Sequence, residues 1–263
     1  MNCVNDIITF LETLAPRNMA ENWDNVGLLC GSAGTPVTKI LVALDPFPSV
    51  CQEAAQLGAE LVVTHHPLIF SPLKSITDES SVGRCIHTLL KNGISAVNAH
   101  TNLDMAPGGV NDVLAQTLGL EDISIPFPFG QDESGQPYGL LRVGTVPSQP
   151  VDAFLSQVKD RLVCPGLRYT DGGKPVHRVA VGGGACGSEW LQAVEAGCDT
   201  FVTADVKYNQ FWDAQQAGLT LIDAGHFYTE NPIVSVLAEK LQSVFPEIQV
   251  ITSKIHCDCM KFF

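Results

Sequence analysis

The chain is organised around the stretch Leu61-Val62-Val63-Thr64-His65-His66-Pro67. The apolar run indicates a buried strand, and the proline favours an end to that strand because it has no N–H for a central ladder. Side chains alternate across a strand, so two adjacent histidines can share one opening only where the strand is ending. The stretch therefore predicts a strand whose carboxyl end presents two imidazoles. Hydrogen-bonded core histidines are the alternative interpretation.

The composition indicates a compact globular protein, because 45% of the 263 residues are hydrophobic and 16% are charged. This length suits one large domain or two of ordinary size. The net charge of −13 argues against a nucleic-acid-binding surface, which needs a basic stripe. It does not argue against an anionic small-molecule substrate, because a bound metal ion can supply local positive charge.

Nine cysteines are scattered along the chain without the spacing of a disulfide framework. An odd number of this kind predicts reduced thiols in a cytosolic protein. Residues 1–16 have the spacing of an amphipathic helix and not of a signal peptide. No apolar run approaches the roughly 20 residues that a membrane span requires. We therefore expect a cytoplasmic protein that does not enter the membrane.

Alternating strand and helix patterns predict an α/β fold. In the first half, strands are expected at 39–45, 61–64 and 94–97, and helices at 4–15, 48–57, 84–91 and 109–118. These short separations define βαβ units, which imply parallel strands. Residues 125–136 are rich in proline, phenylalanine, glycine and acidic residues, which marks a boundary. Beyond it, strands are expected at 139–146, 167–170 and 178–181, and a helix at 150–162. The predicted lobes are residues 1–124 and 125–263.

The second half of the chain repeats the first. Residues 39–64 align without gaps on residues 178–203, and residues 92–100 resemble 217–226 with one inserted residue. A histidine and a carboxylate four residues apart follow in both halves, as His100 and Asp104 and as His226 and Glu230. We interpret the pattern as an internal duplication that gives two pseudo-symmetric α/β lobes. Chance similarity between two βαβ units is the alternative.

The histidines and carboxylates share one kind of position. Sites in open α/β sheets form beyond the carboxyl ends of strands, where the candidate ligands lie: His65, His66, His100, Asp104, His226 and Glu230. Imidazoles mixed with carboxylates suit Zn, Mn, Fe, Co or Ni. The set is large enough for two ions, which polarise a shared water molecule and need a bridging carboxylate. Core histidines and N-capping acids are the structural alternative.

Five segments resemble the signature motifs of the Nif-three-like family, whose members are often labelled homologues of GTP cyclohydrolase I type 2. They are residues 23–28 (WDNVGL), 64–67 (THHP), 100–104 (HTNLD), 203–208 (TADVKY) and 225–230 (GHFYTE). The motifs span nearly the whole chain in the family's order.

The resemblance implies a dinuclear metal centre between two related lobes, in a ring-shaped homohexamer. Residues 1–124 would supply the ligands His65, His66 and Asp104, and residues 125–263 would supply His226 and Glu230. Glu230 is the preferred bridging carboxylate. His100 matches a family position close to the metals. Asp24 and Asp205 match motif loops near the site, and His100 or Asp24 is the expected proton shuttle.

Two classes of function follow from the resemblance. The first is a hydrolase that uses two divalent ions, with a metal-bound hydroxide attacking a nucleotide such as GTP or a similar small molecule. The alternative is a non-catalytic protein, either a metal-binding or metal-chaperone protein or a scaffold for protein partners.

Three features do not fit the family pattern directly. Asn209 stands where many relatives have a histidine. The tail at residues 255–260 (IHCDCM) is not a family feature, and it suggests either a soft-metal site or an unstructured or strand-edge tail.

Gly182-x-Gly184-x-x-Gly187 formally matches a dinucleotide fingerprint. The motif lies at a βα turn of the repeat, so we do not expect NAD. Backbone N–H groups of this turn are a looser candidate for binding a phosphate.

Overall fold

A computed structural model describes residues 2–262, and the chain divides into two compact units. The first unit consists of Met1–Ala106 and Ile233–Cys257, and the second consists of Pro107–Pro232 and Asp258–Phe263. These units overlap the predicted lobes but are not the same segments, because residues 107–124 pack with the second unit and residues 233–257 return to the first.

The first unit is built on a five-stranded sheet. Its order is β1 (Gly27–Cys30), β4 (Ser95–Asn98), β3 (Leu61–Thr64), β2 (Lys39–Ala43) and β13 (Gln249–Thr252). The last four strands are parallel, whereas β1 pairs antiparallel with β4. The predicted βαβ units are therefore present. Strands β1 and β13 were not expected from the sequence.

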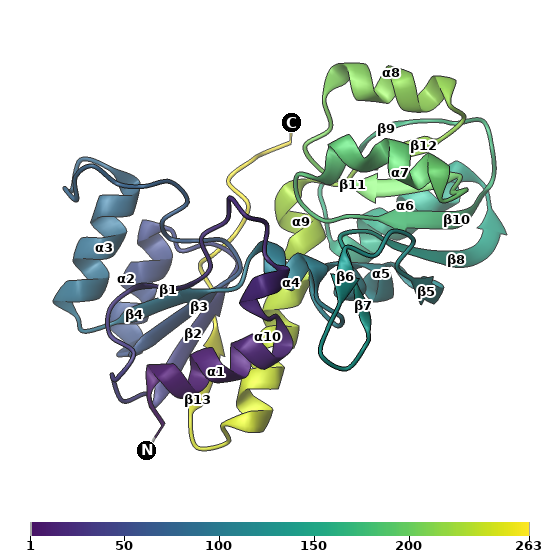
Figure 1. Cartoon of the computed structure of the whole chain (residues 1–263). Coiled ribbons are helices and arrows are strands. Elements are labelled where there is room, and N and C mark those ends of the chain that lie inside the picture. Colours follow the sequence, from purple (N-terminus) through teal and green to yellow (C-terminus); the bar gives the residue numbers. More distant parts are fainter. Residues whose placement is uncertain (1, 263) are drawn as a thin grey trace. The chain divides into compact units, whose positions relative to one another are not determined.

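Helices cover both faces of this sheet (Figure 1). Helices α2 (Pro48–Leu57) and α3 (Ser81–Lys91) bury residues such as Val50 and Leu89 against Leu41 and Val62. Helix α1 (Val4–Leu14) and most of α10 (Pro232–Val244) lie on the opposite face, and the short helices η1 (Arg17–Met19) and α4 (Thr101–Met105) complete the unit. Helix α3 begins before the predicted residue 84 because the Ser80 hydroxyl accepts the Gly83 N–H and caps it.

The second unit is built on a six-stranded sheet. Its order is β5 (Glu121–Ser124), β8 (Arg142–Gln149), β10 (Val176–Val181), β11 (Thr200–Thr203), β12 (Thr220–Asp223) and β9 (Arg168–Thr170). Strands β10, β11 and β12 are parallel, and the other pairs are antiparallel. Residues 125–136, expected to mark a boundary, lie within the second unit and lead into a small hairpin, β6 (Gly130–Gln131) and β7 (Pro137–Tyr138).

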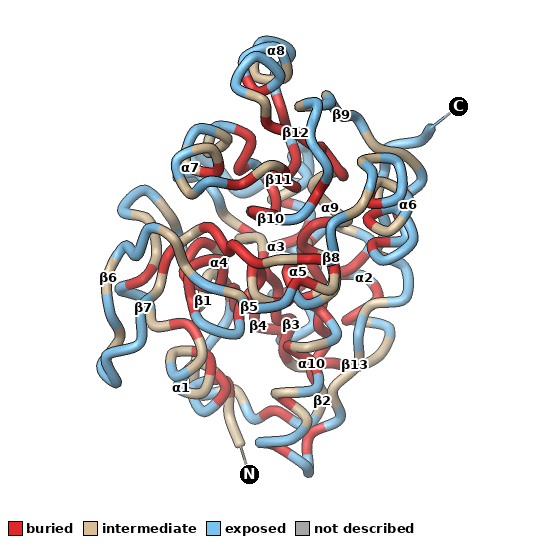
Figure 2. Tube along the Cα trace, turned by 90° about the vertical axis from the view of Figure 1, so that its right-hand side faces the viewer, coloured by how far each residue is buried: buried red, intermediate tan, exposed pale blue. Residues whose placement is uncertain are grey.

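Two helical layers enclose this second sheet. Helices α5 (Val110–Leu118) and α6 (Val151–Leu162) pack on one face, where Phe154 meets Val202 and Ile222. On the other face, Phe201 packs with residues of α7 (Trp190–Glu195) and α8 (Tyr208–Gln216). The short helices η2 (Cys186–Glu189) and α9 (His226–Glu230) follow β10 and β12 respectively. Figure 2 shows the parallel strands buried and the outer helical surfaces exposed.

The two sheets use the same strand register at the aligned positions. Ile40 pairs with Leu61 in the first sheet, and the aligned Val179 pairs with Thr200 in the second. Thr64 pairs with Asn98, and Thr203 pairs with Asp223. Residues that align between 39–64 and 178–203 therefore occupy equivalent positions in the pairing of their strands.

All nine cysteines are free thiols, and seven of them are buried or half-buried. Within residues 2–262, no helix combines the length and the apolar character needed to cross a membrane.

Candidate metal centre

At the carboxyl edge of the first sheet, three neighbouring strands end at the same level. Ala43, Thr64 and Asn98 lie side by side in the register of β2, β3 and β4. The pairing continues one residue further, because His66 N donates to Leu44 O at 2.9 Å and Ala99 N donates to Thr64 O at 3.1 Å. The residues that follow each strand, including the two adjacent histidines and His100, therefore emerge at one edge.

Three imidazoles meet at this edge. The ring centroids of His65 and His66 are 4.9 Å apart, and His100 lies 5.2 Å from the first ring and 5.5 Å from the second. One nitrogen from each ring can be chosen so that all three lie within 4.8 Å of one another. His65 is almost fully buried, with 1% of its surface exposed. The two adjacent imidazoles thus lie close together where the strand ends.

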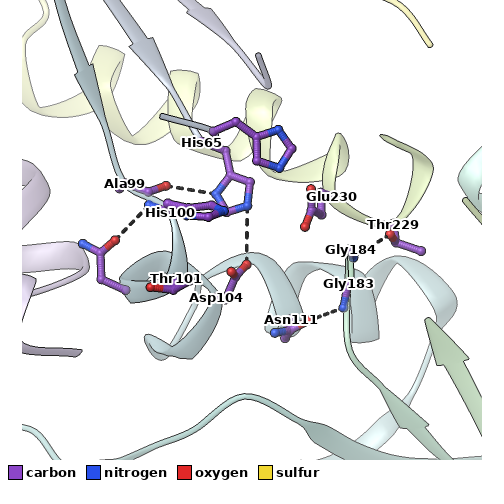
Figure 3. A network of polar contacts seen from close by, with 12 residues as sticks. His65, Ala99, His100, Thr101, Asp104, Asn111, Gly183, Gly184, Thr229 and Glu230 are labelled. Atoms are coloured by element: carbon purple, nitrogen blue, oxygen red, sulfur yellow. Dashed lines mark hydrogen bonds and ion pairs between the residues drawn. The ribbon is translucent and has the colours of Figure 1, made fainter. Parts of the chain in front are cut away.

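Each imidazole is held at Nδ1 by an oxygen. His65 Nδ1 lies 2.9 Å from the Ala99 carbonyl oxygen (Figure 3), His66 Nδ1 lies 2.7 Å from Asp45 Oδ1, and His100 Nδ1 lies 2.9 Å from Asp24 Oδ1. Metal-ligating histidines usually donate one ring N–H to a carboxylate or carbonyl in this way, which fixes the tautomer. A metal would therefore bind these rings at Nε2.

Asp104 adds a carboxylate to the histidines of the first unit. It lies in α4 and is 9% exposed, and its Oδ1 is 3.5 Å from His65 Nε2. Figure 3 shows the two side chains turned toward each other. This mixed imidazole and carboxylate set fits a borderline divalent cation such as Zn or Fe.

Asp24 serves as a hydrogen-bond acceptor at the edge of this cluster. Its Oδ2 accepts the backbone N–H and the hydroxyl of Thr101, and its Oδ1 faces His100. Burial alone would raise the pKa of Asp24, but the hydrogen bonds from His100 and Thr101 and the charge of His100 outweigh it and lower the pKa to about 2. Asp24 is therefore an ionised carboxylate at neutral pH that orients His100.

The second unit carries its own histidine and carboxylate pair. His226 and Glu230 lie one turn apart in α9, with His226 Nε2 3.0 Å from Glu230 Oε2. His226 Nδ1 is held 2.8 Å from Asp205 Oδ2, so this ring follows the pattern of the first unit. Asp205 adopts a left-handed backbone with φ of 53°, a conformation in which aspartate is enriched among non-glycine residues.

The glycine turn after β10 lies against Glu230, and two of its backbone N–H groups have hydrogen-bond partners. Gly183 N donates to Asn111 Oδ1 at 2.7 Å and Gly184 N donates to Thr229 Oγ1 at 3.0 Å, so both N–H groups are already used (Figure 3). A Cβ on Gly184 would lie 2.0 Å from Glu230 Oε1. The dinucleotide interpretation and the looser phosphate role are therefore disfavoured, and the glycine permits close approach of the glutamate.

The predicted residues thus fall into two sets. His65, His66, His100, Asp104 and Asp24 are gathered in the first unit, and His226 and Glu230 with Asp205 are gathered in the second.

The sequence analysis missed Asp45, the partner of His66, and His256, a second partner of Asp45. Asp45 directly follows the predicted strand at 39–45, and the rule that a ligating histidine needs an acceptor could have identified it. His256, which contacts Asp45, lies in a tail that carried no family signal.

Fold and site together define an α/β protein with candidate divalent-metal ligands at the carboxyl edges of its sheets. The family model for Duf34/NIF3 (NGG1p interacting factor 3) matches residues 2–258. A GTP cyclohydrolase 1 type 2 homolog of Clostridium perfringens is 35% identical over 262 residues, which covers 98% of this chain and 99% of the relative. The corresponding homolog of Lactococcus lactis is 32% identical over 255 residues, covering 95% and 96%. The chain belongs to the Duf34/NIF3 family, which confirms the resemblance of its motifs.

Solved structures show the same fold over the whole chain. A Bacillus cereus protein related to NIF3 matches with a TM-score of 0.94 and 26% identity, covering 100% of this chain and 99% of that one. A Staphylococcus aureus hypothetical protein matches with a TM-score of 0.91 and 30% identity, covering 99% of each chain.

Proposed function

We propose that this protein is a hydrolase that depends on two divalent metal ions. The proposal rests on one structural feature that four histidines have in common. Nδ1 lies against a carboxylate or carbonyl oxygen in each of them: His65, His66, His100 and His226. Such bonds fix the tautomer and raise the basicity of the other ring nitrogen, as metal ligands require. His177 also places Nδ1 against a carbonyl oxygen, that of Val146, but it belongs to none of the groups among the described residues that could hold a metal ion, whereas the four histidines do.

The ligands are assigned by their chemistry. Following the family resemblance, we assign His65, His66, Asp104, His226 and Glu230 as the ligands of two divalent ions, with Glu230 as the bridging carboxylate. The mixture of imidazole and carboxylate suits Zn, Mn, Fe, Co or Ni. When bound, two such ions would lower the pKa of a water molecule enough to make it a nucleophile near neutral pH.

The protein's own proton-transfer group is His100. Its Nδ1 is held by Asp24, so a proton would move at Nε2. Asp24 is fixed in turn by Thr101, which donates its backbone N–H at 3.0 Å. Asp24 orients the imidazole, and His100 exchanges the proton with the substrate.

A nucleotide is the substrate class that we favour. The relatives are named GTP cyclohydrolase 1 type 2 homologs, which suggests GTP or a similar molecule. Trp23 and Phe70 support this choice, because they are 59% and 60% exposed and their ring centroids lie 6.2 and 6.3 Å from that of His100. Exposed aromatic side chains offer faces on which a purine can stack.

Three further properties belong to the proposal. The two units derive from a duplicated α/β segment and are pseudo-symmetric. The chain assembles into the ring-shaped homohexamer that the family resemblance implies. The free cysteines suit a reducing compartment, so we place the protein in the cytoplasm.

Turnover of nucleotides by the metal-loaded protein tests the proposed activity. We expect saturable hydrolysis of GTP or a related nucleotide that disappears in His66→Ala. The matched control is His87→Ala, because His87 is an exposed histidine of α3 in the same unit. A protein that binds metal, turns over no nucleotide and passes its metal to acceptor proteins would contradict the hydrolase and support a metal chaperone.

A further inference from the structure

The C-terminal segment after β13 contains a buried histidine that the family motifs do not explain. The side chain of His256 is only 4% exposed. It belongs to the first unit, as do β2, α2 and the histidine cluster. A buried imidazole needs polar partners for its ring nitrogens.

The backbone of this segment is anchored by a buried carboxylate. Ser253 N donates to Val42 O at 2.8 Å, which continues the pairing of β13 with β2. Glu53 of α2 is 9% exposed, and its carboxylate accepts the Lys254 N–H at 3.0 Å and the Ser253 hydroxyl. Ser253 Oγ in turn accepts the His256 N–H at 3.1 Å. The segment is therefore fixed without any help from the imidazole.

The imidazole of His256 reaches the carboxylate that holds His66. His256 Nε2 lies 2.9 Å from Asp45 Oδ2, and His66 Nδ1 lies 2.7 Å from Asp45 Oδ1. The Phe47 ring packs against His256 with centroids 5.9 Å apart and planes inclined by 33°. One carboxylate thus lies between two imidazoles, one from the cluster and one from the chain's end.

The charge state of Asp45 agrees with this geometry. Burial raises the pKa of the Asp45 carboxyl, but hydrogen bonds from His256 and His66 outweigh it and hold the pKa well below its ordinary value. Each oxygen of Asp45 faces one imidazole nitrogen. A carboxylate with one fixed oxygen can still rotate, whereas a second buried donor locks its plane.

We propose that His256 is a positioning residue of the metal centre that acts through Asp45. By fixing both oxygens of Asp45, His256 keeps the His66 Nδ1–H engaged and directs His66 Nε2 toward a metal. This inference rests on the proposed metal site. It makes the C-terminal segment part of that site, although the segment contributes no ligand of its own.

Metal affinity, measured by competition with a chelator, tests the proposal with Co²⁺ as the probe. Outer partners of ligating histidines typically contribute about 10–100-fold to affinity, and we expect about tenfold weaker binding in His256→Ala. His256→Gln should recover most of the loss, because its amide N–H can still reach Asp45. The Co²⁺ absorption spectrum should shift in His256→Ala and return in His256→Gln.

A double-mutant cycle separates this role from general stabilisation. Asp45→Ala combined with His256→Ala should bind metal as weakly as Asp45→Ala alone, because the histidine acts through the aspartate. Losses that multiply in the double variant would overturn the proposal. The control His87→Ala should match the wild type.

Two other outcomes separate the role of His256 from the existence of the metal centre. Wild-type affinity and an unchanged spectrum in His256→Ala would overturn the role of His256 and leave the proposed metal centre standing. A wild-type protein that binds no Co²⁺ would overturn both.

Discussion

Two matching segments, residues 39–66 and 178–205, form the same hydrogen bonds at the amino edges of their sheets. At the carboxyl edges they carry different side chains. At the amino edge, Glu60 accepts the backbone N–H groups of Thr38 and Lys39 at 3.1 and 2.8 Å. In the alignment, Asp199 falls on Glu60, and it accepts the N–H groups of His177 and Arg178 at the same two distances. This edge holds neighbouring strands in register, and both segments do so in the same way.

The carboxyl edge has different chemistry in the two segments. When the alignment is extended by two residues, His66 falls on Asp205, and Asp45 falls on Gly184. In the first segment the aligned position carries a candidate ligand, and in the second it carries the carboxylate that holds His226. One backbone frame thus carries either a candidate ligand or the partner of a candidate ligand at the same position, while the opposite edge keeps the same hydrogen bonds in both segments.

The largest expected difference is between substitutions at those aligned positions. His66→Ala removes a ligand and should weaken metal binding more than 100-fold, above the roughly 10–100-fold range of outer partners. Asp205→Asn removes only the charge that orients His226 and should fall within that range. Chelator competition with Zn²⁺ measures both. Equal losses in the two variants would break the proposed distinction between ligand and partner.

The two carboxylates that hold histidines should also differ in their effect on stability. The side chain of Asp24 is fully buried with four hydrogen bonds, whereas that of Asp205 is 51% exposed. Asp24→Asn should lower the free energy of unfolding by about 2 kcal/mol, because buried donors lose their acceptor. Asp205→Asn should change it by less than about 0.5 kcal/mol. Urea unfolding in EDTA measures both values, and a larger loss in Asp205→Asn would contradict the comparison.

Gly184, which aligns with Asp45, provides a third test. Gly184→Ala would press on Glu230, and we expect about tenfold weaker metal binding, equivalent to about 1.4 kcal/mol. Gly197→Ala is a matched control, since Gly197 has a similar positive φ and no atom near its added Cβ. Both variants should lose about 1 kcal/mol of stability to backbone strain. Unchanged metal affinity in Gly184→Ala would show that the turn does not position Glu230.

The smallest expected effect is on the free energy of unfolding, at the amino edge where Glu60 binds the backbone. Burial raises the pKa of the Glu60 carboxyl, but the N–H groups of Thr38 and Lys39 outweigh it and lower the pKa. The resulting stabilisation is present above the unfolded pKa of about 4.3 and is lost as pH falls through the folded value. Glu60→Gln should cost about 1 kcal/mol at pH 7, with the difference from wild type shrinking below about pH 4. A difference that is constant from pH 7 to 3 would contradict this account.

Much of the fold could be predicted from the sequence. Helix α2 begins at Pro48 and ends before Gly58, as expected, because proline favours the first helical turn and glycine adopts the left-handed C-cap. Strands 61–64 and 178–181 were identified by their apolar runs. Strand β13 was missed, because a short strand at the sheet edge has only half-buried residues and a weak hydrophobic pattern.

The site was only partly predictable. The histidines and their spaced carboxylates stand out as motifs, so His65, His66, Asp104, His226 and Glu230 could be selected. The partners that hold the rings come from distant parts of the chain. Asp45 and His256 are 211 residues apart and meet only through tertiary packing, and the Ala99 carbonyl carries no side-chain signal at all.

The number of metal ions per chain tests the central claim most directly. Elemental analysis should be made on protein purified without a His-tag, beside His65→Ala and Glu230→Ala as variants from the two units. We predict about two ions per wild-type chain and loss of metal in both variants. A wild-type protein that stays metal-free after incubation with Zn, Mn or Fe would contradict the metal centre and leave the histidines as structural residues.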